Sequence, residues 1–224
     1  MAKRTGLRDN AIATLERNHT LTQNDIGPDA CLKSKGTTLE TESWEIQDVG
    51  HLCILQMKAL FGLMRMETVV IAPTGVDAPL FNQDWVMAFG TETQIVELYN
   101  TQLQPWPEQS QEAFESVREK YADLPDAQSK DAHWYDKILY PCSLHKRGRK
   151  LTEPLSRATQ EYLETYAGQL ASLPPCDTHE KAAKVRAFAE RLFDEGGPAV
   201  DYITKFFGAQ TARRLIVQHM YGVK

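Results

Sequence analysis

Four short apolar runs with short breaks between most of them limit how this chain can fold. They cover residues 52–59, 66–72, 85–89 and 94–99. Their length and their content of β-branched and aromatic residues predict strands. The breaks at Phe61-Gly62 and at Phe89-Gly90-Thr91 are short enough for hairpins, so neighbouring strands should be antiparallel. Only the connection over residues 73–83 is long.

Helical spacing of apolar residues occupies most of the rest of the chain. It predicts helices over residues 7–18, 107–121, 152–170 and 178–193, then one that starts at Pro198 and stops at Gly208, and a last amphipathic segment to Tyr221. A further extended stretch is expected over residues 133–144. No shift in composition forces a boundary, so we expect a single domain over residues 1–224, with an antiparallel sheet flanked by helices from both ends of the chain.

Composition and missing motifs exclude several classes of protein. The 224 residues carry a net charge of −5, which argues against a nucleic-acid binder. No apolar stretch reaches the length of a membrane helix or a secretory signal, so we expect a cytoplasmic protein without a membrane partner. The four cysteines and six histidines lack metal-ligand spacings, so no metal site is predicted. Glycine-rich nucleotide loops and the serine-hydrolase elbow are absent too.

Asp84 is the clearest candidate for a functional residue. It comes directly before the apolar run at 85–89. A buried carboxylate there must be paired, or protonated at a raised pKa, and either state is costly. On a regular strand the bulky Trp85 points to one face and Asp84 to the other. The alternative interpretation is that Asp84 caps a strand edge or turns a loop.

Residues 77–84, Asp-Ala-Pro-Leu-Phe-Asn-Gln-Asp, resemble a segment of a known family. The ferredoxin-dependent bilin reductases carry Asp-Leu-Pro-x-Phe-Gly-x-Asp after a strand that ends in Pro, and the last Asp is their catalytic aspartate. That position falls on Asp84. Residues 134–144 are similar to the family's Trp-containing region before a basic residue. Residues 199–221, with Phe206-Phe207-Gly208, are similar to its C-terminal helices.

The sequence also departs from this family. The histidine that accompanies the aspartate in some members falls near Thr68, and a strand glutamate falls near Gln56. Neither residue is a ready proton donor. Asn82 replaces the usual glycine. Asp84 would therefore act alone or with a neighbour. Glu67 and His51 are the candidates for that neighbour, although a lone Glu or His on a strand is usually structural or solvent-facing.

The resemblance implies a three-layer α/β/α sandwich with a central antiparallel sheet and a pocket for a linear tetrapyrrole. No cofactor would be bound, because reduced ferredoxin supplies the electrons and the protein supplies protons through Asp84. The tetrapyrrole propionates need cations, and the candidates are Lys137, Lys146, Arg147 and Arg149. The basic run, which consists of His145, Lys146, Arg147, Arg149 and Lys150, could instead receive the acidic ferredoxin, or be a solvated turn.

Two other functions stay open. A non-catalytic protein could use this fold to carry a tetrapyrrole or another planar ligand, which the loss of the His and Glu positions favours. An unrelated cofactor-free enzyme would make the motif match accidental. The retained Asp84 favours catalysis.

Overall fold

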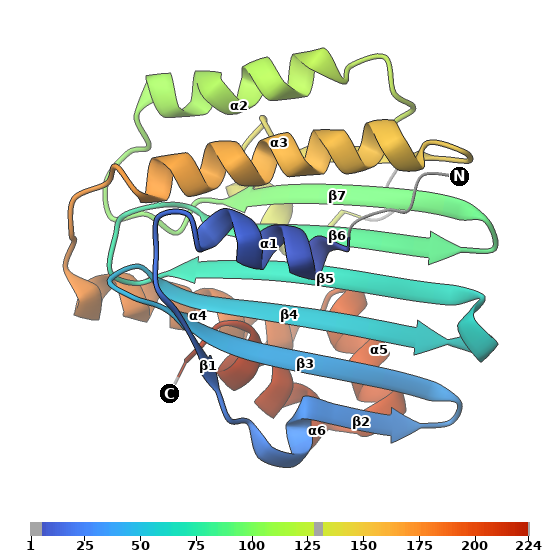
Figure 1. The fold of residues 1–224 in the computed structure, drawn as a ribbon. Helices are drawn as coiled ribbons and strands as arrows, with labels where there is room; N and C mark the ends of the chain where they lie inside the picture. Colours follow the sequence, from blue (N-terminus) through green and yellow to red (C-terminus); the bar gives the residue numbers. More distant parts are fainter. Residues whose placement is uncertain (1–5, 128–131, 224) are drawn as a thin grey trace.

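A single antiparallel sheet of eight strands organises the protein (Figure 1). The computed structural model describes residues 6–127 and 132–223. The strands follow the spatial order β1-β3-β4-β5-β6-β7-β8, and β2 also pairs with β3. Their bounds are β1 Leu21–Asn24, β2 Cys31–Ser34, β3 Thr37–Ile46, β4 Gly50–Ala59, β5 Met64–Pro73, β6 Leu80–Ala88, β7 Thr91–Tyr99 and β8 Leu144–Gly148. Every pairing is antiparallel, as the short connections predict.

The central strands confirm both predicted hairpins and correct the start of one strand. β4 pairs with β5 across the short 3₁₀ turn η2 (Leu60–Gly62), and β6 pairs with β7 across Phe89 and Gly90. Phe89 itself belongs to the turn, with a left-handed φ of 50°. β6 begins at Leu80, so residues 80–83 are strand and the predicted long connection is wrong there. Asp84 consequently lies inside the strand, where alternation fixes the face it occupies.

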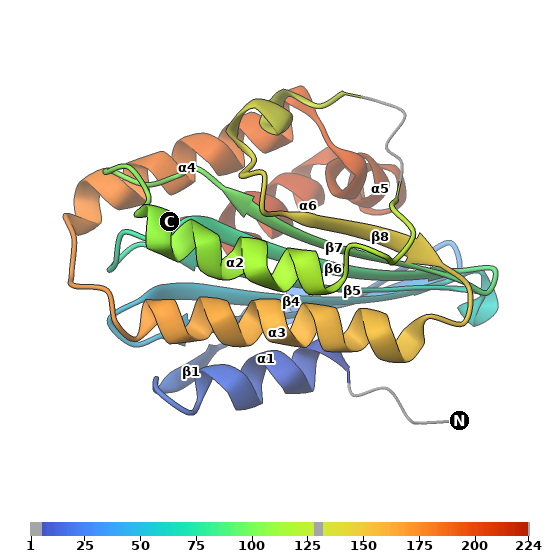
Figure 2. The same ribbon diagram turned by 90° about the horizontal axis from the view of Figure 1, so that it is seen from above.

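Helices cover both faces of the sheet (Figure 2). The helices α1 (Leu7–Leu15), α2 (Glu108–Lys120) and α3 (Thr152–Leu170) lie on one side, and α4 (Thr178–Glu195), α5 (Pro198–Phe207) and α6 (Ala209–Arg213) lie on the other. A π-helix, η4 (Arg214–Met220), continues α6. Asp177 caps α4 by accepting a hydrogen bond from the Glu180 amide at 2.9 Å, and Gly196 ends that helix, as predicted.

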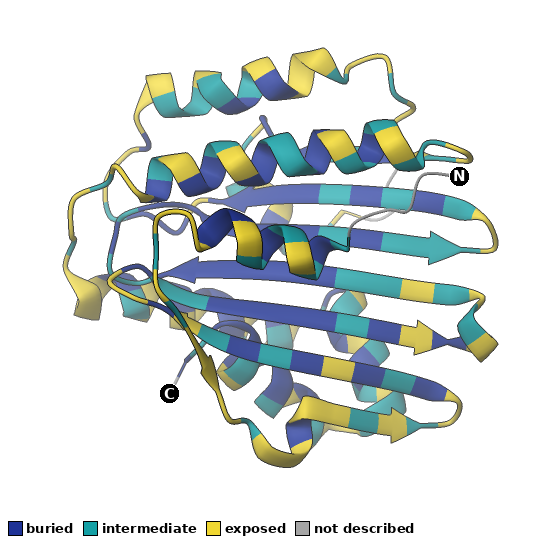
Figure 3. Cartoon of the chain, viewed as in Figure 1, coloured by how far each residue is buried: buried dark blue, intermediate teal, exposed yellow. Residues whose placement is uncertain are grey.

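Each face of the sheet has its own apolar core. Phe81, Trp85 and Val96 pack beneath α1 and α3. The opposite core joins Leu55, Val70 and residues of α4, α5 and η4. Figure 3 shows the covered parts of β4 to β7 as largely buried, whereas β2 at the margin of the sheet is largely exposed. The alternation of buried residues in β6 and β7 therefore supplies both cores from the same two strands.

The predicted extended stretch at 133–144 is wrong over residues 134–138. Its first part forms the short 3₁₀ helix η3 (Trp134–Ile138), where His133 and Asp136 cap each other. The strand in this region, β8, instead contains most of the basic run. A side-chain cap of this kind stabilises a helical turn locally, which apolar periodicity alone does not reveal.

A loop covers the outer edge of β8. The Ala127 amide donates to the His145 carbonyl at 3.0 Å, and the Arg147 amide donates to the Pro125 carbonyl at 2.9 Å. Asp126 forms a bridge with Lys146 in the same ladder. These contacts satisfy backbone groups that an edge strand otherwise leaves unpaired.

Candidate functional site

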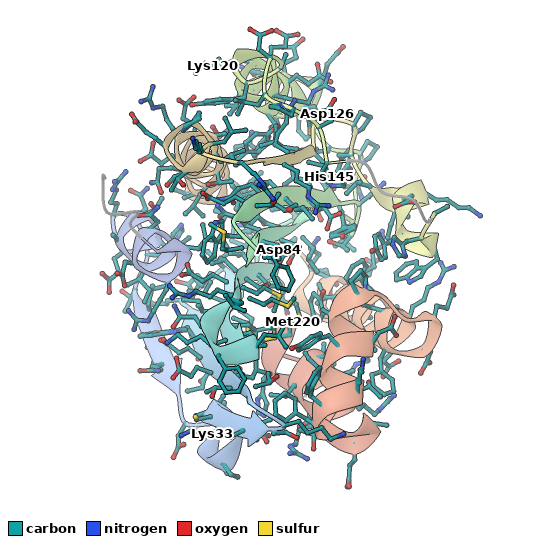
Figure 4. The ribbon with its side chains drawn as sticks, turned by 90° about the vertical axis from the view of Figure 1, so that its right-hand side faces the viewer. Lys33, Asp84, Lys120, Asp126, His145 and Met220 are labelled. Carbon is teal, nitrogen blue, oxygen red and sulfur yellow. The ribbon has the colours of Figure 1, made fainter. Side chains whose placement is uncertain are left out.

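An apolar cavity of about 350 Å³ lies between the sheet and the C-terminal helices. Methionines from β4, β5 and η4 form much of its wall, together with residues of α5 and the aromatic rings of Tyr99, Tyr135 and Phe188. The carboxylates of Asp84 and Glu97 are its acidic lining residues. Figure 4 shows Asp84 between Met220 of η4 and His145 of β8, with Asp126 farther out.

Asp84 reaches this cavity because β6 alternates. Trp85 and Phe81 point to the face covered by α3, so Asp84 and Asn82 point to the opposite face. The Asn82 side-chain amide donates to Asp84 Oδ2 at 2.7 Å, and the Thr68 hydroxyl donates to Oδ1. Burial outweighs these two hydrogen bonds and raises the pKa of Asp84 to about 6. The carboxyl group can therefore hold and release a proton near neutral pH.

Thr68 lies directly opposite Asp84 in the β5–β6 register, the position at which the resemblance places a histidine. The other positions considered from the sequence lie elsewhere. Gln56 lines the groove on the opposite side of the sheet, and Glu67 Oε2 accepts from the Leu7 amide of α1 on that same side. His51 Nε2 lies 2.7 Å from the His219 carbonyl oxygen, beyond the lining of the Asp84 cavity. Glu67 and His51 are therefore not the partners of Asp84.

A second carboxylate, Glu97 of β7, belongs to the same polar group. Asn82 Nδ2 lies 3.5 Å from Glu97 Oε2 and thus bridges the two acids. The Tyr99 hydroxyl donates to Oε2 at 2.5 Å. His145 Nε2 lies 3.1 Å from Oε1, an ion pair by distance, and Glu97 raises the pKa of His145. The site is thus a connected set of two acids, an amide, a phenol and an imidazole.

The four predicted cations lie outside the residues that line this cavity among those the structure describes. Lys146 is buried and points to the other side of the sheet, where its Nζ contacts Asp126 Oδ1 at 2.7 Å and two backbone carbonyls. Arg147 is exposed, and alternation of β8 places it on the same face as His145. Arg149 follows the strand, with its Nε 3.4 Å from Thr91 Oγ1. Lys137 is exposed on η3.

Two larger hollows, of about 980 and 1640 Å³, are open surface grooves. Within residues 6–127 and 132–223, neither is lined by Asp84 or Glu97. No group of three or more potential His, Cys, Asp or Glu metal ligands was found in that same part of the chain. It also contains no helix long and apolar enough to cross a bilayer. The cavity that contains both acids is therefore the candidate site.

Sequence reasoning found Asp84 but missed Glu97 and the role of His145. Glu97 stands inside an apolar strand, so an isolated charged residue at an unfavourable position was the available signal. His145 was noticed only as one member of the basic run. The pairing of Asn82 with Glu97 and of Ile95 with His145 brings these residues together, and cross-strand register cannot be obtained from a single strand.

Comparison with known proteins supports the fold. No protein-family model and no curated protein matches the chain. Among solved structures, a phytochromobilin synthase from tomato in complex with biliverdin superposes with a TM-score of 0.75 at 13% sequence identity. The match covers 96% of this chain and 83% of that chain. The predicted resemblance to the ferredoxin-dependent bilin reductases is thereby confirmed at the level of the fold, with the low identity expected of a distant relation.

Proposed function

We propose that this protein reduces a linear tetrapyrrole, with electrons from reduced ferredoxin and with Asp84 as a proton donor. The observation that carries the proposal is a carboxyl group whose pKa is raised to about 6, placed in an apolar cavity of a fold shared with a biliverdin-bound enzyme. A general acid works best when its pKa lies near the working pH. The helices on the two faces of the sheet would form the outer layers of an α/β/α sandwich, in a single cytoplasmic domain.

The proposed substrate accounts for chemistry without a bound cofactor. An extended conjugated bilin can accept one electron at a time, so the protein has to bind it, orient it and deliver protons. Thr68 and Asn82 hold the Asp84 carboxyl at the cavity wall, which fixes the atom from which the proton leaves. The apolar wall excludes water around that proton and strengthens electrostatic effects.

The cavity is at the small end of the range for ligand pockets, about 300–1,000 Å³. We therefore expect part of a bound tetrapyrrole, including its propionates, to remain in contact with solvent. Arg147 and Arg149 are the proposed propionate ligands, because the strand places Arg147 on the cavity side of the sheet and both side chains are exposed. Lys137 is a further candidate. Lys146 is the least suitable, because its ammonium group already contacts three oxygen atoms.

A second candidate function is binding of a tetrapyrrole without reduction. Thr68 favours it, because a threonine opposite Asp84 cannot exchange protons as a histidine does. Both functions require bilin binding, so they differ only in turnover.

Titration with biliverdin and related bilins, followed by visible absorbance, tests binding. We expect a dissociation constant of about micromolar. Reduced ferredoxin is then supplied anaerobically while the bilin band is followed. Asp84→Asn should keep binding but cut reduction by roughly 100-fold or more, whereas Asp9→Asn on the exposed face of α1 should not. No spectral change with any bilin would reject both functions. Binding without turnover would reject the reductase and favour a protein that binds the bilin without reducing it.

A separate pair of variants tests whether Arg147 binds a propionate of the bilin. Arg147→Ala should weaken bilin binding by about 1.5 to 3 kcal/mol if it pairs with a propionate. Arg157→Ala is the matched control, since that exposed arginine lies on α3 and pairs with Glu153 at 2.9 Å. An unchanged affinity, with a ferredoxin-supported rate that falls and becomes less sensitive to salt, would assign Arg147 to ferredoxin docking.

A further inference from the structure

Glu97 is a second acid in a cavity whose wall is mostly apolar. It lines the same cavity as Asp84, although most of the surrounding wall is methionine, aromatic rings and aliphatic residues. An ionised carboxylate beside apolar groups carries a large desolvation cost. Tyr99, Asn82 and His145 all approach its two oxygen atoms and offset that cost. The fold therefore maintains a second acid in contact with whatever fills the cavity.

His145 connects this buried acid with the surface. Its side chain is 32% exposed, whereas that of Glu97 is 12% exposed. The same imidazole borders a separate outer hollow of about 310 Å³, lined also by Asp126, Asp136 and Tyr140. His145 thus lies between solvent and Glu97, whereas the hydrogen bonds that the described residues make to Asp84 come from the side chains of Thr68 and Asn82. The two acids of one cavity therefore differ in their partners, because Glu97 is the one in contact with an imidazole that reaches the surface.

The charges around His145 favour its protonated form. Among the described residues, the acidic groups that act on it are Glu97 of β7, Asp136 of η3 and Asp84 of β6. Asp126 of the covering loop is a fourth, with Lys146 bound to it. The nearest of these, Glu97, raises the pKa of His145 most, so the imidazole carries a proton over a wider range of pH than a free histidine.

We propose that the Glu97–His145 pair is a second proton source for the bound tetrapyrrole, in which His145 supplies the proton from the side of the outer hollow and Glu97 relays it to the substrate. The inference rests on the proposed reductase function. Reduction of one double bond adds two electrons and two protons, and two molecules of reduced ferredoxin are oxidised. Asp84 loses one proton to the substrate. The His145 imidazolium loses the other from Nε2 through the Glu97 carboxylate, which passes it on to the substrate. The neutral His145 then takes a proton from water in the outer hollow, which restores the pair.

Four variants of the whole chain test this proposal. Glu97→Gln should keep bilin affinity within about threefold and slow reduction by about 100-fold, the lower end of the effect of a general acid. Glu92→Gln is the matched control, because Glu92 is a buried acid on the same strand but faces away from this cavity. A structural effect of losing a buried carboxylate would appear in both variants. Reduction should slow only in Glu97→Gln.

His145 is tested by its dependence on pH and by chemical rescue. In the wild type the rate should fall as pH rises through the raised pKa of His145, and His145→Gln should lose this limb and be about tenfold slower below it. Added imidazole should restore His145→Ala at least severalfold, because the vacated site borders the outer hollow. It should leave Glu97→Gln unchanged. A positioning role that does not involve protons would change neither the pH limb nor the response to imidazole.

The outcomes separate this inference from the function on which it rests. A wild type that reduces bilins while Glu97→Gln and His145→Gln match it in rate and pH dependence overturns the role of these two residues alone. A wild type that binds but never reduces a bilin overturns the reductase and the second proton source together. If Glu97→Gln does not fold, the His145 pH limb and imidazole rescue still decide, and the absence of both rejects the proposal.

Discussion

Strand β7 presents a buried acid to each face of the sheet, Glu92 to one and Glu97 to the other, and the two acids differ in their surroundings. Glu92 lies beneath α3, where it accepts from Trp85 Nε1 at 3.1 Å and from the Thr152 hydroxyl. Glu97 lies on the other face, where its donors are joined by an imidazole that reaches the surface. Both residues are nearly inaccessible: the exposed fraction of the whole residue is 3% for Glu92 and 9% for Glu97.

This difference separates a structural acid from a chemical one. The donors to Glu92 tie β7 to β6 and to the start of α3, and that face is packed with stacked rings such as Phe81 on Tyr166, with centroids 4.7 Å apart. On the other face, the polar groups border a cavity and are connected to one another. Burial alone therefore does not identify a functional carboxylate; a cavity and a route for protons do.

The largest expected difference between the faces is in packing. Phe81→Ala should lower the free energy of unfolding by about 3 to 5 kcal/mol, because a fully buried ring leaves a void beneath α3. Bilin affinity should stay unchanged. Met57→Ala on the cavity side should cost less stability, since its side chain already borders empty space, but should weaken bilin binding. Denaturant unfolding and bilin titration of both variants measure this, and equal losses of affinity would remove the distinction.

A second test compares the charges. The pKa of Asp84 is raised to about 6 in the folded state, against about 3.9 when unfolded. Its contribution to stability is therefore fully present below pH 4 and is lost as pH rises through 6. Asp84→Asn should stabilise the protein by up to about 3 kcal/mol at pH 8, with little change at pH 4.

Glu92→Gln should show the opposite sign at pH 8, because it loses charge-assisted hydrogen bonds from Trp85 and Thr152. Denaturant unfolding of both variants and of the wild type at pH 4 and pH 8 measures these changes in the free energy of unfolding. If Asp84→Asn destabilises the protein at pH 8, the carboxylate is stabilised in the cavity and cannot serve as a ready acid.

The smallest expected change in stability comes from removing the Thr68 hydroxyl. Thr68→Val keeps the shape of the side chain and removes the donor to Asp84. We expect a loss of about 1.5 kcal/mol at pH 8, where Asp84 is ionised, and less at pH 4. Thr159→Val is the control on the other side of the sheet, because its hydroxyl donates to helix carbonyls and should show the same cost at both pH values. Equal pH dependence in the two variants would contradict the Thr68–Asp84 contact.

Much of the scaffold could be predicted because its signals are local. Helix ends at Asp177, Gly196 and Gly208 depend on capping and backbone preferences of single residues. Hairpins depend on short breaks between apolar runs. The strand of Asp84 was placed too late in the chain because polar residues such as Asn82 and Gln83 interrupt the apolar pattern, although both are buried in the structure.

The site could be predicted only in part. Strand alternation correctly separates Asp84 from Trp85, but the partner of Asp84 depends on the register of β5, and that of Glu97 on β7 and β8. The basic run misled in one respect: Lys146 and Arg147 are adjacent in sequence but lie on opposite faces of β8. A cluster of like charges along a chain is therefore not a cluster in space.

The loop that covers β8 has a consequence for the behaviour of the protein in solution. A bare edge strand invites another chain to extend the sheet, and this route leads to aggregation and strand exchange. Here residues 125–127 occupy that edge through backbone hydrogen bonds, one of which holds the carbonyl of His145. Protection against self-association and the placement of the imidazole thus depend on the same three residues, so selection for solubility would also preserve the geometry of the site.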